Sequence, residues 1–270
     1  MAKSIKDLKK TYFILSIIFL FLFTNICHSQ SSPSSNNFFI RGNLNINNNG
    51  IDWVPFFSRD KPSLIANFSI GGERLSVSPL IRYELDGFQP WGFDIWWNYK
   101  IKKSGKFNFS LGGVFPGVVN QKISVRNYDL PTSILQPWVS AIIKPSVSYL
   151  FGKNFGINLS YFEIIPLKIV NTNQLESGRV IILSPMIKPL TIKNKIYIRW
   201  EPLLYSVQIE DTRTGLFSAQ TLNLGIVNFP FSISSVMNKP IDFGGLSGKK
   251  FDWNIGINYS FELNLIKNTF

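Results

Sequence analysis

Apolar and polar residues alternate along much of this chain, and the longest such stretch runs from Phe251 to Leu265. Its odd-numbered positions are all apolar, and its even-numbered positions are all small or polar. A period of two places these sets on opposite faces of a β-strand. The stretch is about twice the usual strand length, and about 9–11 residues cross a bilayer at a tilt. The pattern therefore predicts a membrane-crossing strand.

The same alternation recurs along the chain and predicts about twelve strands, with ten or fourteen as alternatives. The predicted strands are 38–46, 63–71, 74–85, 91–101, 106–115, 138–151, 155–164, 178–189, 196–207, 218–229, 231–238 and 251–265. The segment 178–189 has the weakest pattern, because Pro185 and Pro189 interrupt it and proline cannot donate to a strand ladder.

Short and long connections between these strands alternate. Tight turns such as Gly71-Gly72 follow every second strand, whereas the predicted long loops are 47–62, 116–136, 166–177, 208–217 and 238–250. Short turns on one side and long loops on the other are typical of transmembrane β-barrels. An even number of strands lets the first and last strands pair antiparallel, which removes the sheet edges. The fold class is therefore predicted as all-β, an antiparallel up-and-down barrel.

The N-terminus has the pattern of a secretory signal peptide over residues 1–29. Lys3, Lys6, Lys9 and Lys10 precede an apolar core at 12–23 that is too short to span a membrane as a helix. We expect cleavage between Ser29 and Gln30. Lipoprotein processing at Cys27 is the alternative, although Asn25-Ile26 matches a lipid-attachment motif poorly.

Removal of residues 1–29 would remove the only Cys and the only His. Four lysines leave the 28 basic residues and Asp7 leaves the 16 acidic ones, so the charge falls to about +9. Residues 30–37 are rich in Ser, Pro and Asn and predict a flexible lead-in. Residues 38–270 then form one predicted domain. A secreted chain without a basic cluster is not expected to bind nucleic acid.

The signal peptide, the long alternating strands and the C-terminal Phe270 together resemble a Gram-negative outer-membrane β-barrel protein. Phe270 departs from the pattern, since it is out of step with the odd-numbered apolar set. The resemblance implies an outer-membrane location with both termini in the periplasm. It also implies contact with outer-membrane lipid and lipopolysaccharide, and insertion by the barrel-assembly machinery. A soluble β-sandwich is the alternative fold, but it would need an apolar core where these strands carry polar residues.

The two faces of the predicted strands carry different residues. Aromatic residues on the apolar face predict rings at the membrane interfaces, and they are Trp91, Trp97, Tyr99, Tyr149, Trp200, Trp253 and Tyr259. The polar face carries the candidate lumen-lining residues, which are Arg74, Arg82, Glu84, Asp94, Trp96, Lys100, Lys144, Arg199, Glu201 and Glu262. Such charges tune solute passage or simply pair across neighbouring strands.

One ion pair follows from the predicted hairpin around Phe88. Symmetric pairing about that residue predicts that Arg82 lies directly opposite Asp94, and that Glu84 lies opposite Gly92. In a water-filled lumen this ion pair is expected to contribute at most about 1 kcal/mol.

The residues offer little catalytic or metal chemistry. Enzymatic barrels of this kind use a histidine as the base, and residues 30–270 contain no histidine. A catalytic Ser–Lys pair cannot be recognised from the sequence, because both residues are abundant. Glu210 and Asp211 are adjacent and could bind calcium, but a solvated loop is the favoured explanation. We therefore predict no enzyme activity, no metal site and no cofactor.

The predicted function is a porin-like channel for a small polar or anionic solute. The positive net charge is the only indication that the solute is an anion. The alternative is a non-conducting barrel that presents its long loops to partners in the envelope. Barrel architecture alone does not separate these two functions.

Overall fold

The computed structural model describes residues 37–52, 57–127, 130–167 and 177–266. The predicted signal peptide, residues 30–36 of the lead-in and Phe270 lie outside the described residues. The strands are β1 (Asn37–Asn47), β2 (Ser63–Gly71), β3 (Leu75–Glu84), β4 (Gln89–Ser104), β5 (Phe107–Asn127), β6 (Leu130–Leu150), β7 (Phe155–Pro166), β8 (Gly178–Ile187), β9 (Leu190–Ile192), β10 (Ile196–Ile209), β11 (Gly215–Ile226), β12 (Phe231–Asp242), β13 (Asp252–Trp253) and β14 (Gly256–Ile266). No helix in these ranges is long and apolar enough to cross a membrane.

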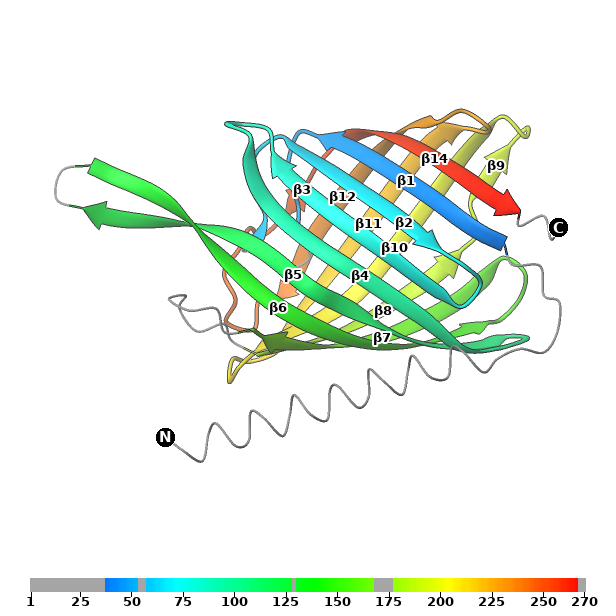
Figure 1. The fold of residues 1–270 in the computed structure, drawn as a ribbon, viewed down its shortest axis with the longest axis horizontal. Helices are drawn as coiled ribbons and strands as arrows, with labels where there is room; N and C mark the ends of the chain where they lie inside the picture. Colours follow the sequence, from blue (N-terminus) through cyan, green and yellow to red (C-terminus); the bar gives the residue numbers. More distant parts are fainter. Residues whose placement is uncertain (1–36, 53–56, 128–129, 168–176, 267–270) are drawn as a thin grey trace. The chain divides into compact units, whose positions relative to one another are not determined.

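Twelve of these strands close into one antiparallel barrel, as the sequence predicted (Figure 1). Each strand pairs with its neighbour in the chain, and β1 pairs with β14 from Asn37↔Ile266 to Asn47↔Gly256. The short strands β9 and β13 extend the ladders of β10 and β12. Closure leaves the wall of the barrel without a free sheet edge.

The alternation of residues sets the two faces of the wall as expected. Trp253, Ile255 and Ile257 are each at least half exposed, whereas Asn254 and Asn258 are buried inside. Large apolar side chains are exposed on the outer face of every long strand. An apolar exterior around a polar interior is the arrangement that a membrane-spanning barrel requires.

The predicted long loop 116–136 is wrong, because this segment forms the outer part of a β5–β6 hairpin. The two strands pair from Phe107↔Tyr149 to Asn127↔Leu130, and the hairpin extends past the barrel wall as a two-stranded ribbon (Figure 1). Pro116 lies where the register shifts, and Pro131 lies in the ribbon, beyond the ladders with β4 and β7. Proline is compatible with such positions, so it was a misleading sign of a loop.

Two other predicted strands are interrupted. The segment 178–189 ends as β8 at Ile187 and resumes as β9, with Pro185 and Pro189 near the break. The last strand is divided into β13 and β14, since Asn254 and Ile255 belong to neither. In contrast, β12 continues to Asp242, past the predicted end at residue 238.

The β3–β4 ladder differs from the predicted register. Arg82 pairs with Gly92 and Asp94 with Leu80, and the register shifts between Arg82 and Tyr83. Tyr83 pairs with Pro90, so Trp91 is the extra residue of this bulge. Its side chain is fully buried, and the prediction that Trp91 lies at the lipid interface is therefore wrong.

Candidate functional site

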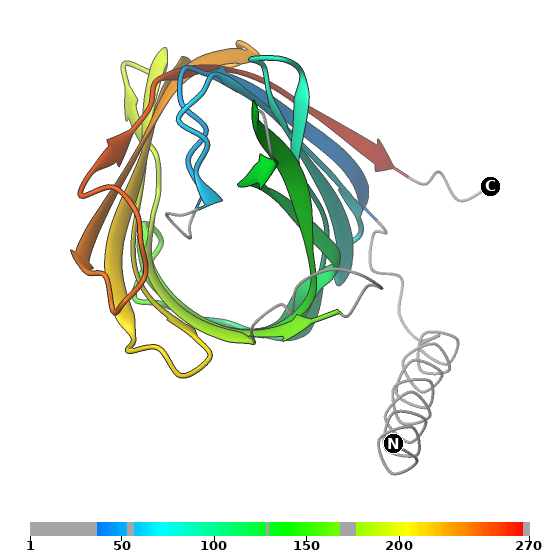
Figure 2. The same ribbon diagram turned by 90° about the vertical axis from the view of Figure 1, so that its left-hand side faces the viewer.

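The described parts of the connection between β1 and β2, residues 48–52 and 57–62, fold into the barrel. Figure 2 shows these parts, blue to cyan, inside the ring of strands at the end where the longer loops lie. Two backbone hydrogen bonds join the two described parts of this connection: Arg59 N–H donates to the Gly50 carbonyl, and Gly50 N–H donates to the Lys61 carbonyl. We call residues 48–52 and 57–62 the inner loop.

An arginine clamp holds the inner loop against the barrel wall. Arg82 donates to Asp94 with an Nη2–Oδ2 distance of 2.7 Å, and its Nη1 donates to Asp52 of the inner loop. All three side chains are about nine-tenths buried. The guanidinium also lies 5.2 Å from the centre of the Trp91 ring. One buried cation thus connects two strands and the loop, which is the charge pairing that burial demands.

The opposite side of the inner loop contacts other strands. Asn238 of β12 donates to the Asp52 carbonyl at 3.4 Å and accepts a bond of 3.0 Å from the Tyr205 hydroxyl. On the side of the arginine clamp, Trp91 Nε1 of β4 also donates to the Phe57 carbonyl at 3.0 Å. The loop is therefore attached to both sides of the interior at this level.

Arg59 makes a further attachment, to the base of the β5–β6 ribbon. Its guanidinium donates to the Asn120 carbonyl. Burial lowers the pKa of Arg59 below its ordinary value, and the carboxylates of Glu84 and Asp52 oppose that fall. Loop and ribbon are thus joined through a cation that has lost part of its hydration.

Two exposed ion pairs tie the rim of the inner loop to neighbouring loops. Lys61 lies 2.7 Å from Asp86, and Lys249 lies 2.5 Å from Asp60. The hydrogen bond to the partner carboxylate raises the pKa of each lysine. Since all four side chains are about half exposed, these pairs contribute little stability.

An apolar cluster occupies the other side of the interior at this end. Tyr205 and Phe217 stack with ring centres 5.2 Å apart, and both are almost completely buried. Phe162, Val180, Ile182 and Val207 complete the buried set, and Phe243 and Leu246 from the loop after β12 pack on it. This end of the barrel therefore has a polar loop on one side of its interior and a packed apolar cluster on the other.

A network of amides and hydroxyls lines the wall formed by β12, β14 and β1. Asn45 donates to Asn258 at 2.8 Å and to Ser234 at 3.1 Å, and Asn43 donates to Ser260 at 2.8 Å. These side chains thus meet one another's hydrogen-bonding needs across three strands. Their polar side chains keep the interior hydrophilic without adding charge.

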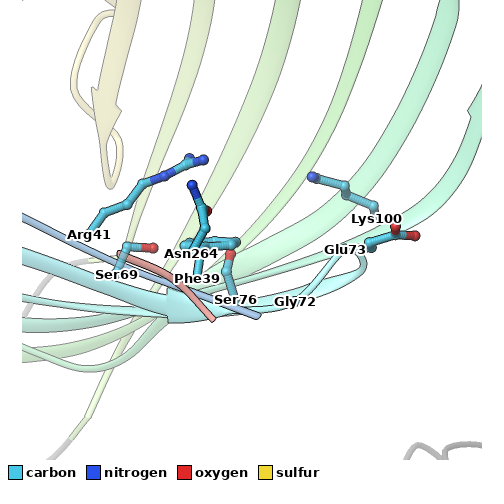
Figure 3. Close-up of a pocket in the computed structure, with 8 residues that line it drawn as sticks. All are labelled: Phe39, Arg41, Ser69, Gly72, Glu73, Ser76, Lys100 and Asn264. Carbon is cyan, nitrogen blue, oxygen red and sulfur yellow. The ribbon is translucent and has the colours of Figure 1, made fainter. Parts of the chain in front are cut away.

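A cavity of about 420 Å³ lies at the opposite end of the barrel, near the β2–β3 turn (Figure 3). Its lining residues are Phe39, Arg41, Ser69, Gly72, Glu73, Ser76, Lys100 and Asn264. Arg41 lies over the Phe39 ring at 4.4 Å and bonds Glu262 at 3.0 Å. We call this cavity the inner-mouth pocket.

The predicted lumen-lining residues fall into separate groups. Arg82, Glu84 and Asp94 are buried near the inner loop. Lys144 lies 5.4 Å from the Trp96 ring, and Lys100 lines the inner-mouth pocket, where Glu262 bonds Arg41. Arg199 and Glu201 alternate along β10 in step with the buried Tyr205. Arg74 lies in the turn before β3 rather than on a strand.

Several interior residues were not among the predicted ones. Arg41 and Asn238 carried a usable signal, since each occupies the polar side of a predicted strand. Asp52 and Arg59 carried no such signal, because the local sequence does not distinguish a loop that folds into the barrel from one that points outward. Across the described ranges, no three His, Cys, Asp or Glu side chains are close enough together to hold a metal ion.

No family model matches this chain, and no curated protein matches it. Solved structures match in fold. The NanC porin is 10% identical over 82% of this chain and 98% of that chain, with a TM-score of 0.47. The monoaromatic hydrocarbon channel CymD is 8% identical over 87% of this chain and 90% of that chain, with a TM-score of 0.42.

The β-domain of the Bordetella autotransporter BrkA is 8% identical over 84% of this chain and all of that chain, with a TM-score of 0.41. At these levels the likeness extends to the fold alone. The predicted antiparallel up-and-down barrel is confirmed by this chain's own structure, which closes into twelve strands.

Proposed function

We propose that this protein is an outer-membrane channel for small polar solutes, narrowed by its inner loop. The observation that carries this proposal is the attachment of Asp52 to Arg82 on one side and to Asn238 on the other. A loop fixed across the interior limits the size of what passes while leaving polar groups along the path. Ion and solute selectivity in barrels follows from such pore-lining groups.

The charges of the interior support a preference for anions. Arg82 and Arg41 have carboxylate partners. In the part of the chain that the structure describes, Lys100, Lys144 and Arg199 have no carboxylate within ion-pair distance. Glu201 is likewise without a basic partner there. Among these four wall residues, which lie outside the arginine clamp, three cations stand against one anion, and this local excess of positive charge favours anions in a narrow passage.

The location belongs to the same proposal. The apolar exterior fits a bilayer, and the long strands fit its thickness. We place both termini in the periplasm, with outer-membrane lipid and lipopolysaccharide around the barrel and the barrel-assembly machinery as the partner for insertion. The protein should stay in the outer-membrane fraction after a carbonate wash, and recovery as soluble periplasmic protein would contradict this location.

A second candidate function is a non-conducting barrel that binds partners through its outer loops. The packed cluster around Tyr205 and Phe217 favours it, because this cluster fills one side of the interior. The β5–β6 ribbon would then be the part that reaches furthest from the wall (Figure 1).

Planar-bilayer recording of the purified protein separates the two functions. A channel gives discrete current steps, with a reversal potential displaced toward the anion in a salt gradient. A folded barrel that inserts without any current steps would contradict the channel and support the second candidate. Folding is checked independently by the resistance of the barrel to unfolding in detergent at low temperature.

A further inference from the structure

The inner-mouth pocket combines features of a binding site rather than of a plain channel wall. Its volume of about 420 Å³ lies within the range of small-molecule sites, about 300–1,000 Å³. Five strands contribute to it, since Arg41 and Ser69 are opposite each other on β1 and β2, Phe39 is opposite Asn264 on β14, and Ser76 lies on β3. Lys100 comes from β4. The closed ladder between these strands fixes the backbone positions from which the lining side chains extend.

The cationic groups of the pocket converge. In Figure 3 the Arg41 guanidinium and the Lys100 ammonium point into the same space, whereas the Glu73 carboxylate points away from it. Arg41 is oriented by the Phe39 ring on one side and by Glu262 on another. Lys100 has no carboxylate within ion-pair distance among the described residues. The space between the two cations is therefore suited to a negative group.

The remaining lining groups are small and polar. Ser69 and Ser76 supply hydroxyls, and Asn264 supplies an amide that both donates and accepts. A ligand that fills the rest of the pocket therefore needs hydroxyl groups of its own. The Ser69 hydroxyl already accepts a hydrogen bond from Ser78, but an apolar ligand would cover the other polar groups without bonding them, which disfavours its binding.

We propose that the inner-mouth pocket is a binding subsite for small hydroxylated anions, with the anionic group between Arg41 and Lys100. This subsite deepens the proposed channel function, because it would concentrate anionic solutes at one mouth of the lumen. The chemistry fits a carboxylate or a phosphate. Binding to the pocket does not require conduction, so the two proposals can fail separately.

The test is a ligand-observed NMR titration of the purified barrel at low salt with glycerate, glycerol 3-phosphate and glycerol. At least one of the two anions should bind. The anion with the lower dissociation constant shows whether the pocket prefers a carboxylate or a phosphate. Glycerol should bind at least about tenfold more weakly, since it lacks the charged group. Binding of glycerol as tight as that of the anions, or no binding of either anion, would overturn the proposal.

Variants assign the binding to this pocket. Lys100→Gln should weaken anion binding about tenfold. Lys153→Gln removes the same charge from the β6–β7 turn and serves as the control. The double variant Arg41→Gln, Glu262→Gln keeps the local net charge but should also lose binding. An unchanged dissociation constant in Lys100→Gln, or an equal loss in Lys153→Gln, would overturn the assignment.

Discussion

Arg82 reaches Asp94 diagonally across the β3–β4 ladder, with 2.7 Å between Nη2 and Oδ2, while Gly92 lies directly opposite Arg82. A side chain at position 92 would meet the guanidinium, because a Cβ there would lie 2.7 Å from Arg82 Nη2. The glycine thus leaves the space through which Arg82 reaches both Asp94 and Asp52. Gly92 therefore makes room for the clamp that holds Asp52 of the inner loop.

Replacing Arg82 should destabilise the barrel strongly. Arg82→Gln removes the cation that bonds both Asp94 and Asp52, and loss of one partner of a buried ion pair costs about 3–5 kcal/mol. Urea unfolding in detergent or lipid vesicles measures the free energy. Arg213→Gln is the control, because its pair with Asp242 is largely exposed and its loss should cost at most about 1 kcal/mol. Equal losses in the two variants would show that Arg82 is not buried as described.

Releasing the inner loop should widen the channel. Asp52→Asn removes the carboxylate that bonds Arg82 but keeps the Arg82–Asp94 pair, so the loop loses its ionic attachment to the β3–β4 wall and keeps only the weaker hydrogen bond from Trp91 there. Single-channel conductance should rise, and larger neutral solutes should pass in a liposome-swelling assay. Asp60→Asn breaks only the exposed bond to Lys249 and should leave conductance near the original value. A conductance that is unchanged in Asp52→Asn would mean that the loop does not limit flow.

The strand number and facing followed from the sequence because each strand satisfies a local rule. Ile257 and Asn258 are assigned to opposite faces by parity alone, and parity needs no knowledge of neighbours. The same rule failed at Trp91, since one extra residue in a bulge turns a side chain to the other face. No local signal marks that bulge, and the predicted register was wrong for the same reason.

The inward position of the inner loop could not be predicted from the sequence, and the reason differs from that for the bulge. Asp52, Arg82 and Asn238 lie far apart in the sequence, and they meet only after the barrel closes. The predicted ion pair between Arg82 and Asp94 does form, but the sequence suggested an exposed pair of small energy. The inner loop buries it and so changes its energetic role.

The apolar cluster offers a test of the second candidate function. Phe217 is fully buried and stacks on Tyr205, so Phe217→Ala should cost about 3–5 kcal/mol. If this cluster is what obstructs the interior, the same variant should also create or raise conductance. Phe229→Ala, at an exposed position, should change neither quantity much. Loss of stability without any change in conductance would separate the packing role of the cluster from the passage of solutes.

Adjacent residues on β11 test the orientation of the wall. Leu222 is exposed on the outer face near the middle of the strand, whereas Thr221 pairs with Glu201 on the inner face. Leu222→Arg should cost about 2–4 kcal/mol in a lipid bilayer, because it places a charge in the hydrocarbon. Thr221→Arg should cost much less, since Glu201 lies beside it. The free energies of unfolding from lipid vesicles compare the two, and similar costs would contradict the assigned faces.

Lys144 tests whether the excess positive charge of the interior sets selectivity. Its ammonium lies 5.4 Å from the Trp96 ring and 5.7 Å from the Phe162 ring, and no carboxylate in the described ranges is within ion-pair distance. Its charge is therefore not cancelled locally and acts on passing ions through a low-dielectric wall. Lys144→Gln should displace the reversal potential in a salt gradient toward that of the cation.

The matched control for this measurement is Lys153→Gln, which removes an equal charge in the exposed β6–β7 turn. Screening at about 0.1 M salt acts over about 10 Å, so a charge outside the passage should have a much smaller effect. The difference between the variants should shrink as the salt concentration rises. Equal shifts in both variants would indicate that the net charge of the protein, and not the position of Lys144, determines the anion preference.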